Sequence, residues 1–579
     1  MIRLTRYAGF ILALILLLSP AGSAWSLFGS GDTAGGVAES AIEDDGMIRV
    51  YLGSLGKPES LLLTLAGEYV IGATGAFRFE RGTEVIVTAS GDRALITVGG
   101  LTLDMGASFT FTRCAAQEGE ENGIYIYQSE RDALYAGDLT ISCEDGRLTP
   151  IIKIGMEDYL YGVVAYEMSD SFPLEALKAQ AVAARTYAMS RKITRFAAAY
   201  DVTDTTSDQV YKGLITEYQN VIRAVEATGG VVGTYNGNYA SCYYTASNGG
   251  QIATPTQIWG GEGDYGYIEM KDDPYDLESP RSLVNSFAAP RAYDAANALH
   301  RMLDTKIDRS GHYDVRIDAI ESITPTDPKH EGSRMYQKMA FTLTLSARDA
   351  GWVPIDFGGE QLFGWALGYA YIDGVWHARG VSDWAQLPET QTVELTVYDD
   401  LKDQLALGLN KTDYELASVA ETQDGFTIEM RRYGHGVGMS QRGAQWMAGE
   451  YGKDYVEILS FYYPGMALER IDWDAPELPA KESLPAAVAT LQMLIPPAQT
   501  QLPALEDGEY YAAVNLSDTR SRLNVRKSPT TDSDIVVKLD TGYKLIVSTV
   551  REDGWARVRT ANFEGYVRMD YIRGLDDAP

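Results

Sequence analysis

The chain has 579 residues and is poor in cysteine and in positive charge. Its 3 cysteines are too few for a disulfide-based scaffold or for a zinc site built from four thiolates. Lys and Arg number 49 against 80 Asp and Glu, which leaves a net charge of −31 at pH 7. A phosphate backbone would repel this charge, so we predict no nucleic-acid partner. Apolar residues still make up 45% of the chain, which excludes wholesale disorder.

Long apolar runs are also scarce, with one exception at the N-terminus. Two arginines precede an apolar run at residues 8–18, and small residues follow up to Ala24. This order is typical of a secretory signal peptide, and the run is too short to span a bilayer comfortably. We therefore expect a signal peptide at residues 1–24. The protein would be secreted or extracytoplasmic, and membrane-anchored if the segment is not cleaved.

The residue pattern predicts a mostly β fold with an inserted helical segment, an α+β arrangement, followed by a separate small β-barrel. Short β-branched segments run from Met47 to about Ile154, and helical spacing begins at Met156. An Ala-rich helix is expected from Pro173 to about Phe196, with Ser171 as its cap. A third helical stretch is expected at residues 218–227. Residues 231–430 return to β-like segments that a helical patch at 292–303 interrupts, and a further helix is expected at 454–462.

Composition shifts predict the domain boundaries. Residues 25–45 are rich in Gly, Ala and acid and indicate a flexible leader. Six prolines between residues 476 and 503 predict a semi-rigid linker at 471–506. The main domain would then occupy residues 46–470, and a small β module would occupy residues 507–574.

One candidate site lies on the predicted helices. Glu167 follows an apolar helix, and partial burial there would raise its pKa and keep it usable as an acid near neutral pH. Lys178 and Arg185 are seven residues apart, so they share a helix face and could bind an anionic or hydroxyl-rich ligand. The alternative is an ordinary helix pair in which Glu167 forms a structural ion pair with Arg185.

Two glycine-rich stretches add neutral polar groups. The stretch 434–444 contains His435, Ser440 and Gln441 among glycines that imply tight turns and a close approach. Hydroxyl and amide side chains suit sugar hydroxyls and N-acetyl groups. The stretch 241–250 ends in a turn signal, and Ser247 could be a ligand contact. A structural β-bulge and an ordinary β-turn are the alternatives.

In this order and spacing, the three stretches resemble the SpoIID/LytB family. That family includes a lytic transglycosylase that acts on peptidoglycan. The resemblance covers about residues 46–470 and is strongest at 150–190 and 431–465. Residues 462–465 match the closing segment of the family, whereas Ser169 stands where a proline usually follows Glu-Met.

The resemblance implies a reaction and a set of site residues. The catalytic glutamate falls on Glu167, which would cleave the bond between N-acetylmuramic acid and N-acetylglucosamine and leave a 1,6-anhydro end. The implied substrate-binding residues are Lys178, Arg185, Ser247, Gly249, Gly250, His435, Ser440 and Gln441. Some members bind zinc near the segment that contains Ser247, but Cys242 has no histidine nearby, so we expect no metal and no cofactor.

The resemblance also implies partners. Denuded glycan strands would be the substrate, in sporulation (engulfment) or in cell-wall remodelling. The C-terminal module resembles a bacterial SH3 domain through residues 523–526, Gly554-Trp555 and 565–567, which implies binding to the cell wall. Because the LytB branch is described as enhancing an amidase, a non-enzymatic glycan-binding enhancer of a wall amidase is the alternative function.

The cysteines leave two further questions open. Cys114 and Cys143 could pair in an oxidising compartment, but the sequence does not decide which two pair, if any. A wall peptidase with Cys242 as nucleophile and His435 as base is a rival enzyme class. Against it, Cys242 lies beside aromatic residues on a predicted strand, not at a helix start that would lower its pKa.

Overall fold

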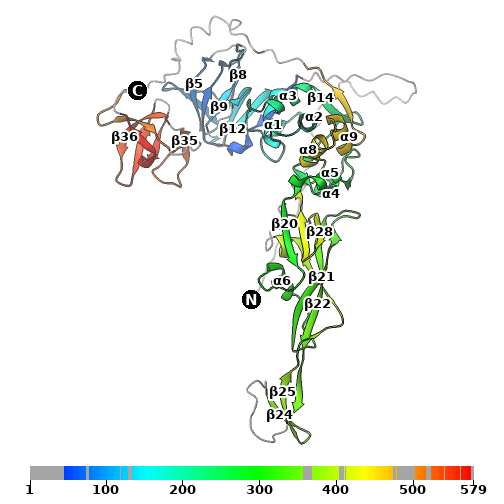
Figure 1. Cartoon of the computed structure of the whole chain (residues 1–579). Coiled ribbons are helices and arrows are strands. Elements are labelled where there is room, and N and C mark those ends of the chain that lie inside the picture. Colours follow the sequence, from blue (N-terminus) through cyan, green and yellow to red (C-terminus); the bar gives the residue numbers. More distant parts are fainter. Residues whose placement is uncertain are drawn as a thin grey trace, which may run out of the picture. The chain divides into compact units, whose positions relative to one another are not determined.

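A computed structural model shows the fold of the chain (Figure 1). It describes residues 45–72, 77–117, 119–127, 134–355, 368–402, 410, 412–473, 478, 502–516, 523–539, 542–560 and 563–575. The expected signal peptide, the leader up to residue 44 and most of the expected linker lie outside the described residues, so their boundaries stay predictions. In the described part of the chain, no helix combines the length and the apolar character that crossing a membrane requires.

The first part of the chain forms two β-sheets around one apolar core. A seven-stranded sheet has the order β13-β1-β12-β11-β8-β3-β4, and a six-stranded sheet has the order β10-β9-β2-β5-β6-β7. The seven strands are Val202–Thr203 (β13), Met47–Tyr51 (β1), Arg147–Gly155 (β12), Asp138–Glu144 (β11), Ser108–Arg113 (β8), Tyr69–Ile71 (β3) and Phe77–Phe79 (β4). The six are Leu134–Tyr135 (β10), Ile124–Ile126 (β9), Ser60–Leu65 (β2), Thr83–Ser90 (β5), Arg93–Val98 (β6) and Leu101–Asp104 (β7). Alternating side chains such as Ile48 and Val50 fill the core, which explains the β-branched segments of the sequence.

Three packed helices follow these sheets: α1 (Met156–Glu167), α2 (Leu174–Thr194) and α3 (Gln219–Ala227). Alanine and long unbranched side chains favour helix in α2. Glu175 in its first turn and Arg191 in its last turn complement the helix dipole. The expected cap at Ser171 is wrong, because Pro173 occupies the N-cap position and no side chain caps this end. Glu167 is the last residue of α1, at the end where α1 and α2 are joined.

Short strands and helices from two distant stretches of sequence meet beside α2. The strand pairs are parallel for Tyr244–Thr245 (β16) with Met439–Ser440 (β31), and antiparallel for Ser247–Asn248 (β17) with Arg432–Tyr433 (β30) and Gln251–Ile252 (β18) with Lys271–Asp272 (β19). A three-stranded sheet joins Val231–Tyr235 (β14), Asn238–Tyr239 (β15) and Ala467–Arg470 (β32). The helices are Pro255–Trp259 (α4), Pro274–Glu278 (α5), Gln441–Gly449 (α8) and Tyr455–Tyr462 (α9). These pairings bring the two glycine-rich stretches together.

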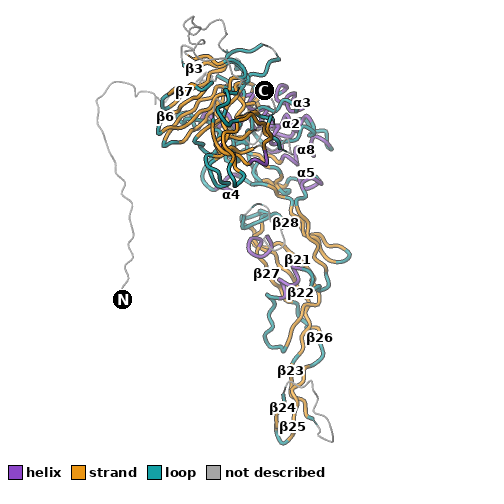
Figure 2. The backbone as a smooth tube through the Cα atoms, turned by 90° about the vertical axis from the view of Figure 1, so that its left-hand side faces the viewer, coloured by secondary structure: helices purple, strands orange, loops and turns teal. Residues whose placement is uncertain are grey.

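A strand-rich excursion separates those two stretches in the sequence and has an apolar core of its own. Figure 2 shows that it consists mainly of strands and loops. Its strands are Asn285–Pro290 (β20), Asp314–Pro328 (β21), Tyr336–Arg348 (β22), Ala350–Pro354 (β23), Tyr369–Ile372 (β24), Val375–Val381 (β25), Ala385–Gln386 (β26), Gln391–Thr396 (β27), Ala417–Thr422 (β28) and Gly425–Met430 (β29). The expected helix at 292–303 forms as α6 (Ala298–Asp304), which Asn297 caps.

The C-terminal module is an antiparallel sheet with the order β35-β34-β38-β37-β36-β33-β39. Its strands are Tyr510–Val514 (β33), Leu523–Arg526 (β34), Ile535–Leu539 (β35), Lys544–Val550 (β36), Trp555–Arg559 (β37), Glu564–Arg568 (β38) and Ile572–Gly574 (β39). The antiparallel strands fit the expected small SH3-like module, and no pairing joins the edge strands β35 and β39 in the described residues, so the sheet does not close into a barrel. The mostly β fold with an inserted helical segment is confirmed.

All three cysteines are unpaired. Cys114, Cys143 and Cys242 are free thiols in buried positions. The pairing considered for Cys114 and Cys143 is therefore not formed in this structure.

Candidate active site

Glu167 is held at the C-terminal end of α1 in half-buried surroundings. The side-chain amide of Gln441 donates to Glu167 Oε2 over 3.2 Å, which joins the end of α1 to the start of α8. The backbone N–H of Val210 also favours the ionised form of the carboxyl group. Burial outweighs both donors and raises the pKa of Glu167 above its ordinary value. The group therefore keeps its proton to a higher pH than an exposed glutamate does.

Two phenols surround this carboxyl group and link it to a groove. Tyr159 Oη donates to Gln209 Oε1 over 3.2 Å, and Gln209 Nε2 donates to Tyr244 Oη over 3.0 Å. Burial raises the pKa of both phenols well above the usual value, and the charge of Glu167 adds to the effect. Gln209 and Tyr244 line the groove, and Glu167, which is not among the lining residues, acts on Tyr244 through its charge.

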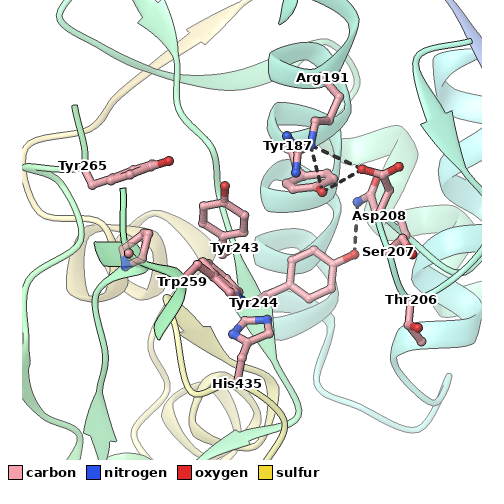
Figure 3. A pocket seen from close by; sticks show the side chains of 13 residues that line it. Tyr187, Arg191, Thr206, Ser207, Asp208, Tyr243, Tyr244, Trp259, Tyr265 and His435 are labelled. Atoms are coloured by element: carbon pink, nitrogen blue, oxygen red, sulfur yellow. Dashed lines mark hydrogen bonds and ion pairs between the residues drawn. The ribbon is translucent and has the colours of Figure 1, made fainter. Parts of the chain in front are cut away.

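The groove has a volume of about 460 Å³ and one strongly aromatic side (Figure 3). Trp259 lies between Tyr243 and His435, with ring centroids 4.9 Å and 5.1 Å away. Trp259 remains 51% exposed, so its ring is available to a ligand. The groove is lined by Tyr187, Arg191, Thr206, Ser207, Asp208, Gln209, Tyr243, Tyr244, Pro255, Trp259, Gly260, Tyr265 and His435. Flat aromatic faces of this kind suit the apolar faces of sugar rings.

The opposite side of the groove is polar and internally paired. Arg191 Nε donates to Tyr187 Oη over 3.0 Å, and that hydroxyl donates to Asp208 Oδ1 over 3.1 Å. Arg191 also lies 3.3 Å from the same carboxylate, and Arg195 lies 2.8 Å from its other oxygen. Burial raises the pKa of Tyr187 to about 12. Asp208 is therefore paired with two guanidinium groups and one phenol.

His435 enters the groove on a backbone that only glycine allows. A Cβ on Gly438 would lie 2.0 Å from the carbonyl oxygen of Tyr243, and the φ angle of Gly438 is +72°. His435 Nδ1 accepts from the backbone N–H of Val437 over 3.0 Å. Burial and the nearby charge of Arg432 lower the pKa of His435 to about 4, so the ring is neutral at physiological pH. A neutral ring suits stacking and hydrogen bonding better than proton abstraction.

The rival peptidase arrangement finds no support in this geometry. Cys242 is fully buried, and its sulfur lies 3.5 Å from Met466 Sδ. Burial raises the pKa of the Cys242 thiol far above its usual value, which is the opposite of what an activated nucleophile needs.

The two basic residues expected at the site hold helices together. Arg185 is 0% exposed, and its guanidinium forms a bidentate pair with Glu157 at 2.9 Å and 2.5 Å. The alternative ion pair of Arg185 with Glu167 is therefore wrong. Lys178 Nζ lies 2.7 Å from Glu175, whose other oxygen accepts from the backbone of Tyr455 at the start of α9. A direct role of either residue in substrate binding stays a prediction.

The remaining expected site residues converge on a carboxylate that sequence reasoning missed. Ser247, Gly249, Gly250 and Ser440 are buried and donate to Asp276 of α5. Asp276 belongs to an Asp-Pro-Tyr-Asp run at residues 273–276, in which the first Asp caps α5. An Asp directly before a proline is a helix-start signal that could have revealed the helix, although not its partners. No cluster of three potential metal ligands occurs in the described part of the chain.

The comparisons with known proteins agree with this architecture. A family model for the stage II sporulation protein matches residues 144–235, and one for the bacterial SH3 domain matches residues 521–573. The first match contains α1 and α2, and the second contains most of the C-terminal sheet. The chain therefore carries a SpoIID family domain and a bacterial SH3 domain, which confirms the resemblance seen in the sequence.

Three relatives extend the match beyond these two domains. The chain is 30% identical over 312 residues to a protein named amidase enhancer from Bacillus subtilis (strain 168), covering 53% of this chain and 40% of that relative. It is 26% identical over 375 residues to stage II sporulation protein D of the same organism, covering 62% and 88%. An uncharacterized protein of Brachyspira hyodysenteriae is 25% identical over 433 residues, covering 74% and 94%. The chain thus spans well under half the length of the amidase enhancer.

Proposed function

We propose that this protein is a peptidoglycan lytic transglycosylase with Glu167 as its acid and base. One observation carries the proposal: a glutamate whose pKa is raised by burial acts electrostatically on Tyr244, which lines an aromatic groove. A carboxyl group whose pKa is raised above its ordinary value is better suited to donate a proton to a glycosidic oxygen. The homology to stage II sporulation protein D supports a cell-wall role.

In the proposed reaction one carboxyl group acts twice. Glu167 protonates the glycosidic oxygen between N-acetylmuramic acid and N-acetylglucosamine, and the C1–O bond breaks. The C6 hydroxyl of the muramic acid then bonds to C1 and gives its proton to the Glu167 carboxylate. The product has a 1,6-anhydro end, the leaving sugar carries the first proton, and no water is consumed.

The charge pattern of the groove supports a reaction with a single carboxyl group. Most glycosidases use two carboxylates that flank the bond. Asp208 also lines the groove, but it is buried between Arg191, Arg195 and Tyr187. A carboxylate neutralised in this way is a poor nucleophile or base, which leaves the chemistry to Glu167 and to the substrate's own hydroxyl.

The remaining parts of the chain suit a wall-bound enzyme. We place the protein outside the cytoplasmic membrane, secreted or anchored by its N-terminal segment, where the SH3 domain would bind the wall. The substrate would be denuded glycan strands, cleaved during engulfment in sporulation or during wall remodelling. Both the location and the substrate state are parts of this proposal.

The deciding experiment digests purified, peptide-stripped glycan strands with residues 25–579. Wild type and Glu167→Gln are compared, and mass spectrometry identifies the new ends. We expect anhydro-muramic ends from the wild type alone. Hydrated reducing ends that are lost in the variant would instead identify a hydrolase, and cleavage by both proteins would remove Glu167 from the mechanism.

A second candidate is a non-enzymatic enhancer of a wall amidase. The 30% identity to the amidase enhancer favours it, although the chain covers only 40% of that relative. The same groove would then bind glycan and present it to the amidase. In that case purified protein would cleave nothing, while wild type and Glu167→Gln would stimulate a wall amidase equally.

A further inference from the structure

A buried carboxylate pair lies behind the strand pairs that carry the glycine-rich stretches. Asp273 and Asp276, at the start of α5, are both 0% exposed. Five donors converge on Asp276: Ser247 Oγ at 2.8 Å, Ser282 Oγ at 3.0 Å, Ser440 Oγ at 2.6 Å, and the backbone N–H groups of Gly249 at 2.8 Å and Gly250 at 3.1 Å. A buried anion is stable only when it is satisfied in this way.

A short chain of contacts runs from this carboxylate to Glu167. Ser440 is the N-cap of α8, and its Oγ accepts from the backbone N–H of Gly443 over 3.0 Å while it donates to Asp276. The next residue, Gln441, donates to Glu167. The position of the Gln441 amide therefore depends on how the first turn of α8 is anchored.

The second carboxylate, Asp273, fixes the first turn of α5 and contacts α9. Asp273 Oδ1 accepts from the backbone of Asp276 over 3.0 Å, and its Oδ2 accepts from Tyr462 Oη over 2.8 Å. A Cβ on Gly443 would lie 2.0 Å from that same Tyr462 oxygen. Close contacts with α5 and α9 therefore fix the position of the first turn of α8.

We propose that Asp276 is a positioning residue, which anchors Ser440 so that Gln441 stays hydrogen-bonded to Glu167. The contact itself is independent of any activity, and its meaning for catalysis rests on the proposed function. Asp276 does not line the groove; it reaches α8 through Ser440, and it also anchors Ser247, Gly249 and Gly250.

The direction in which the pKa of Glu167 changes distinguishes the positioning role of Asp276 from two simpler roles, a direct charge effect and a purely structural role. The Gln441 amide favours the ionised carboxyl group, so losing that donor raises the pKa of Glu167. Loss of a negative charge at Asp276 could only lower that pKa, because an anion disfavours ionisation of a second carboxyl group. A purely structural role would leave it unchanged. The other groups that face Glu167 are the phenols of Tyr159 and Tyr244 and the backbone of Val210.

The test measures the protonation of Glu167 without any substrate. Residues 25–579 are labelled with a carbodiimide and an amine nucleophile at a series of pH values, and mass spectrometry follows the peptide that contains Glu167. Gln441→Leu sets the shift for complete loss of the donor. We expect Asp276→Asn and Ser440→Ala to raise the labelling midpoint by about one pH unit, the size of one charge-assisted hydrogen bond.

Asp318→Asn is the matched control. Asp318 also accepts from a serine, Ser346 Oγ at 2.5 Å, but it belongs to the strand-rich excursion with its separate core. It should leave the Glu167 midpoint unchanged. If Asp276→Asn does not fold, Ser440→Ala decides, since it removes the anchor and keeps the charge. A downward shift or no shift in Ser440→Ala overturns the proposal.

Cleavage of glycan strands gives a second readout that is separate from the first. We expect Ser440→Ala to lower kcat about tenfold with KM little changed, because a misplaced acid affects the chemical step more than binding. Loss of kcat without a shift of the Glu167 midpoint contradicts the positioning role. Absence of cleavage by the wild type would contradict the proposed function and leave the labelling result intact.

Discussion

Asp276 and Glu167 both connect to the first turn of α8, but they differ in solvent exposure and in the number of hydrogen bonds that they accept. Asp276 is sealed from solvent and receives five donors, whereas Glu167 is half-buried and receives the Gln441 amide and one backbone N–H. Burial raises the pKa of both groups. The difference lies in how many donors oppose that effect and whether a ligand can reach the oxygen atoms.

In the proposed function, this difference separates a carboxyl group that organises structure from one that acts as an acid and base. Hydrogen bonds to the ionised form stabilise it and use up the lone pairs that would carry a proton. Glu167 accepts from fewer groups, the Gln441 amide and the Val210 backbone, and the proposed function requires that its carboxyl group exchange a proton with the substrate. The donors to Asp276 come from segments that are far apart in sequence.

The largest expected effect comes from Glu167→Gln. We expect glycan cleavage to fall at least about 100-fold, since general acid–base catalysis contributes that much. The fold should be unaffected, because the carbonyl oxygen of the new amide can still accept from Gln441. Cleavage rates and thermal unfolding measured on one preparation check both parts, and a large loss of stability would show that Glu167 resembles Asp276 after all.

Asp276→Ala, in contrast to Glu167→Gln, should mainly reduce the stability of the fold. It would leave buried hydroxyl and backbone donors without an acceptor, which costs about 3 kcal/mol or more as a broken buried network. Because the chain has several cores, the change is best read locally, by hydrogen exchange of the amides in α5 and α8. We expect exchange there to accelerate about 100-fold. Unchanged protection would mean that the five donors find other partners.

The pH dependence of stability distinguishes the interior pair from exposed acids. Burial and the neighbouring Asp276 raise the pKa of Asp273 from 3.8 to about 6. The folded state therefore binds a proton that the unfolded state releases between these two values. The stability that the folded protein gains from protonated Asp273 is complete below pH 3.8 and is lost as the pH rises through about 6.

Asp273→Asn should remove this dependence. Between pH 4 and 6 the stability of the variant should rise relative to wild type, by up to about 1.4 kcal/mol for each pH unit. Hydrogen exchange of α8 at pH 4, 5 and 6 measures the difference. Parallel pH profiles for the two proteins would contradict it.

Trp259→Ala tests the groove side alone. Loss of one stacking face should weaken binding of a glycan oligomer by up to about tenfold. The half-exposed position of Trp259 predicts little change in stability. Calorimetry with peptide-stripped glycan fragments measures the affinity, and the inactive Glu167→Gln background prevents turnover. Unaltered affinity would place the sugar outside this aromatic stack.

The sequence predicted the Glu167 side of this comparison better than the Asp276 side. Periodicity located α1, α2 and α3 within a few residues, and the apolar surroundings of Glu167 followed from them. The roles expected for Ser247 and Ser440 came from their residue types, but both point to Asp276, about 30 and 160 residues away. Such pairings depend on β16, β17, β30 and β31, strands of two residues each, which are too short to give a pattern.

Arg185 shows a second limit of sequence reasoning. Its spacing from Lys178 placed both on one helix face, but not which acid would pair with it. Glu157, in the first turn of α1, reaches Arg185 because α1 and α2 pack side by side, whereas Glu167 lies at the far end of α1. Helix periodicity gives the face of a residue, and only tertiary packing gives its partner.

Gln180 extends the comparison to a polar group with no donors or acceptors around it. It lies on α2 at 0% exposure, and neither amide atom has a hydrogen-bond partner among the described residues. An unsatisfied buried amide costs about 1 kcal/mol or more, so the similarly sized Leu should stabilise the protein by about that amount. Thermal unfolding of Gln180→Leu beside Gln180→Glu checks the sign, since the charged variant should be destabilised. A stabilised variant with full cleavage would make Gln180 a tolerated defect of the core. A stabilised variant with reduced cleavage would show that the Gln180 amide contributes to the activity despite its cost in stability.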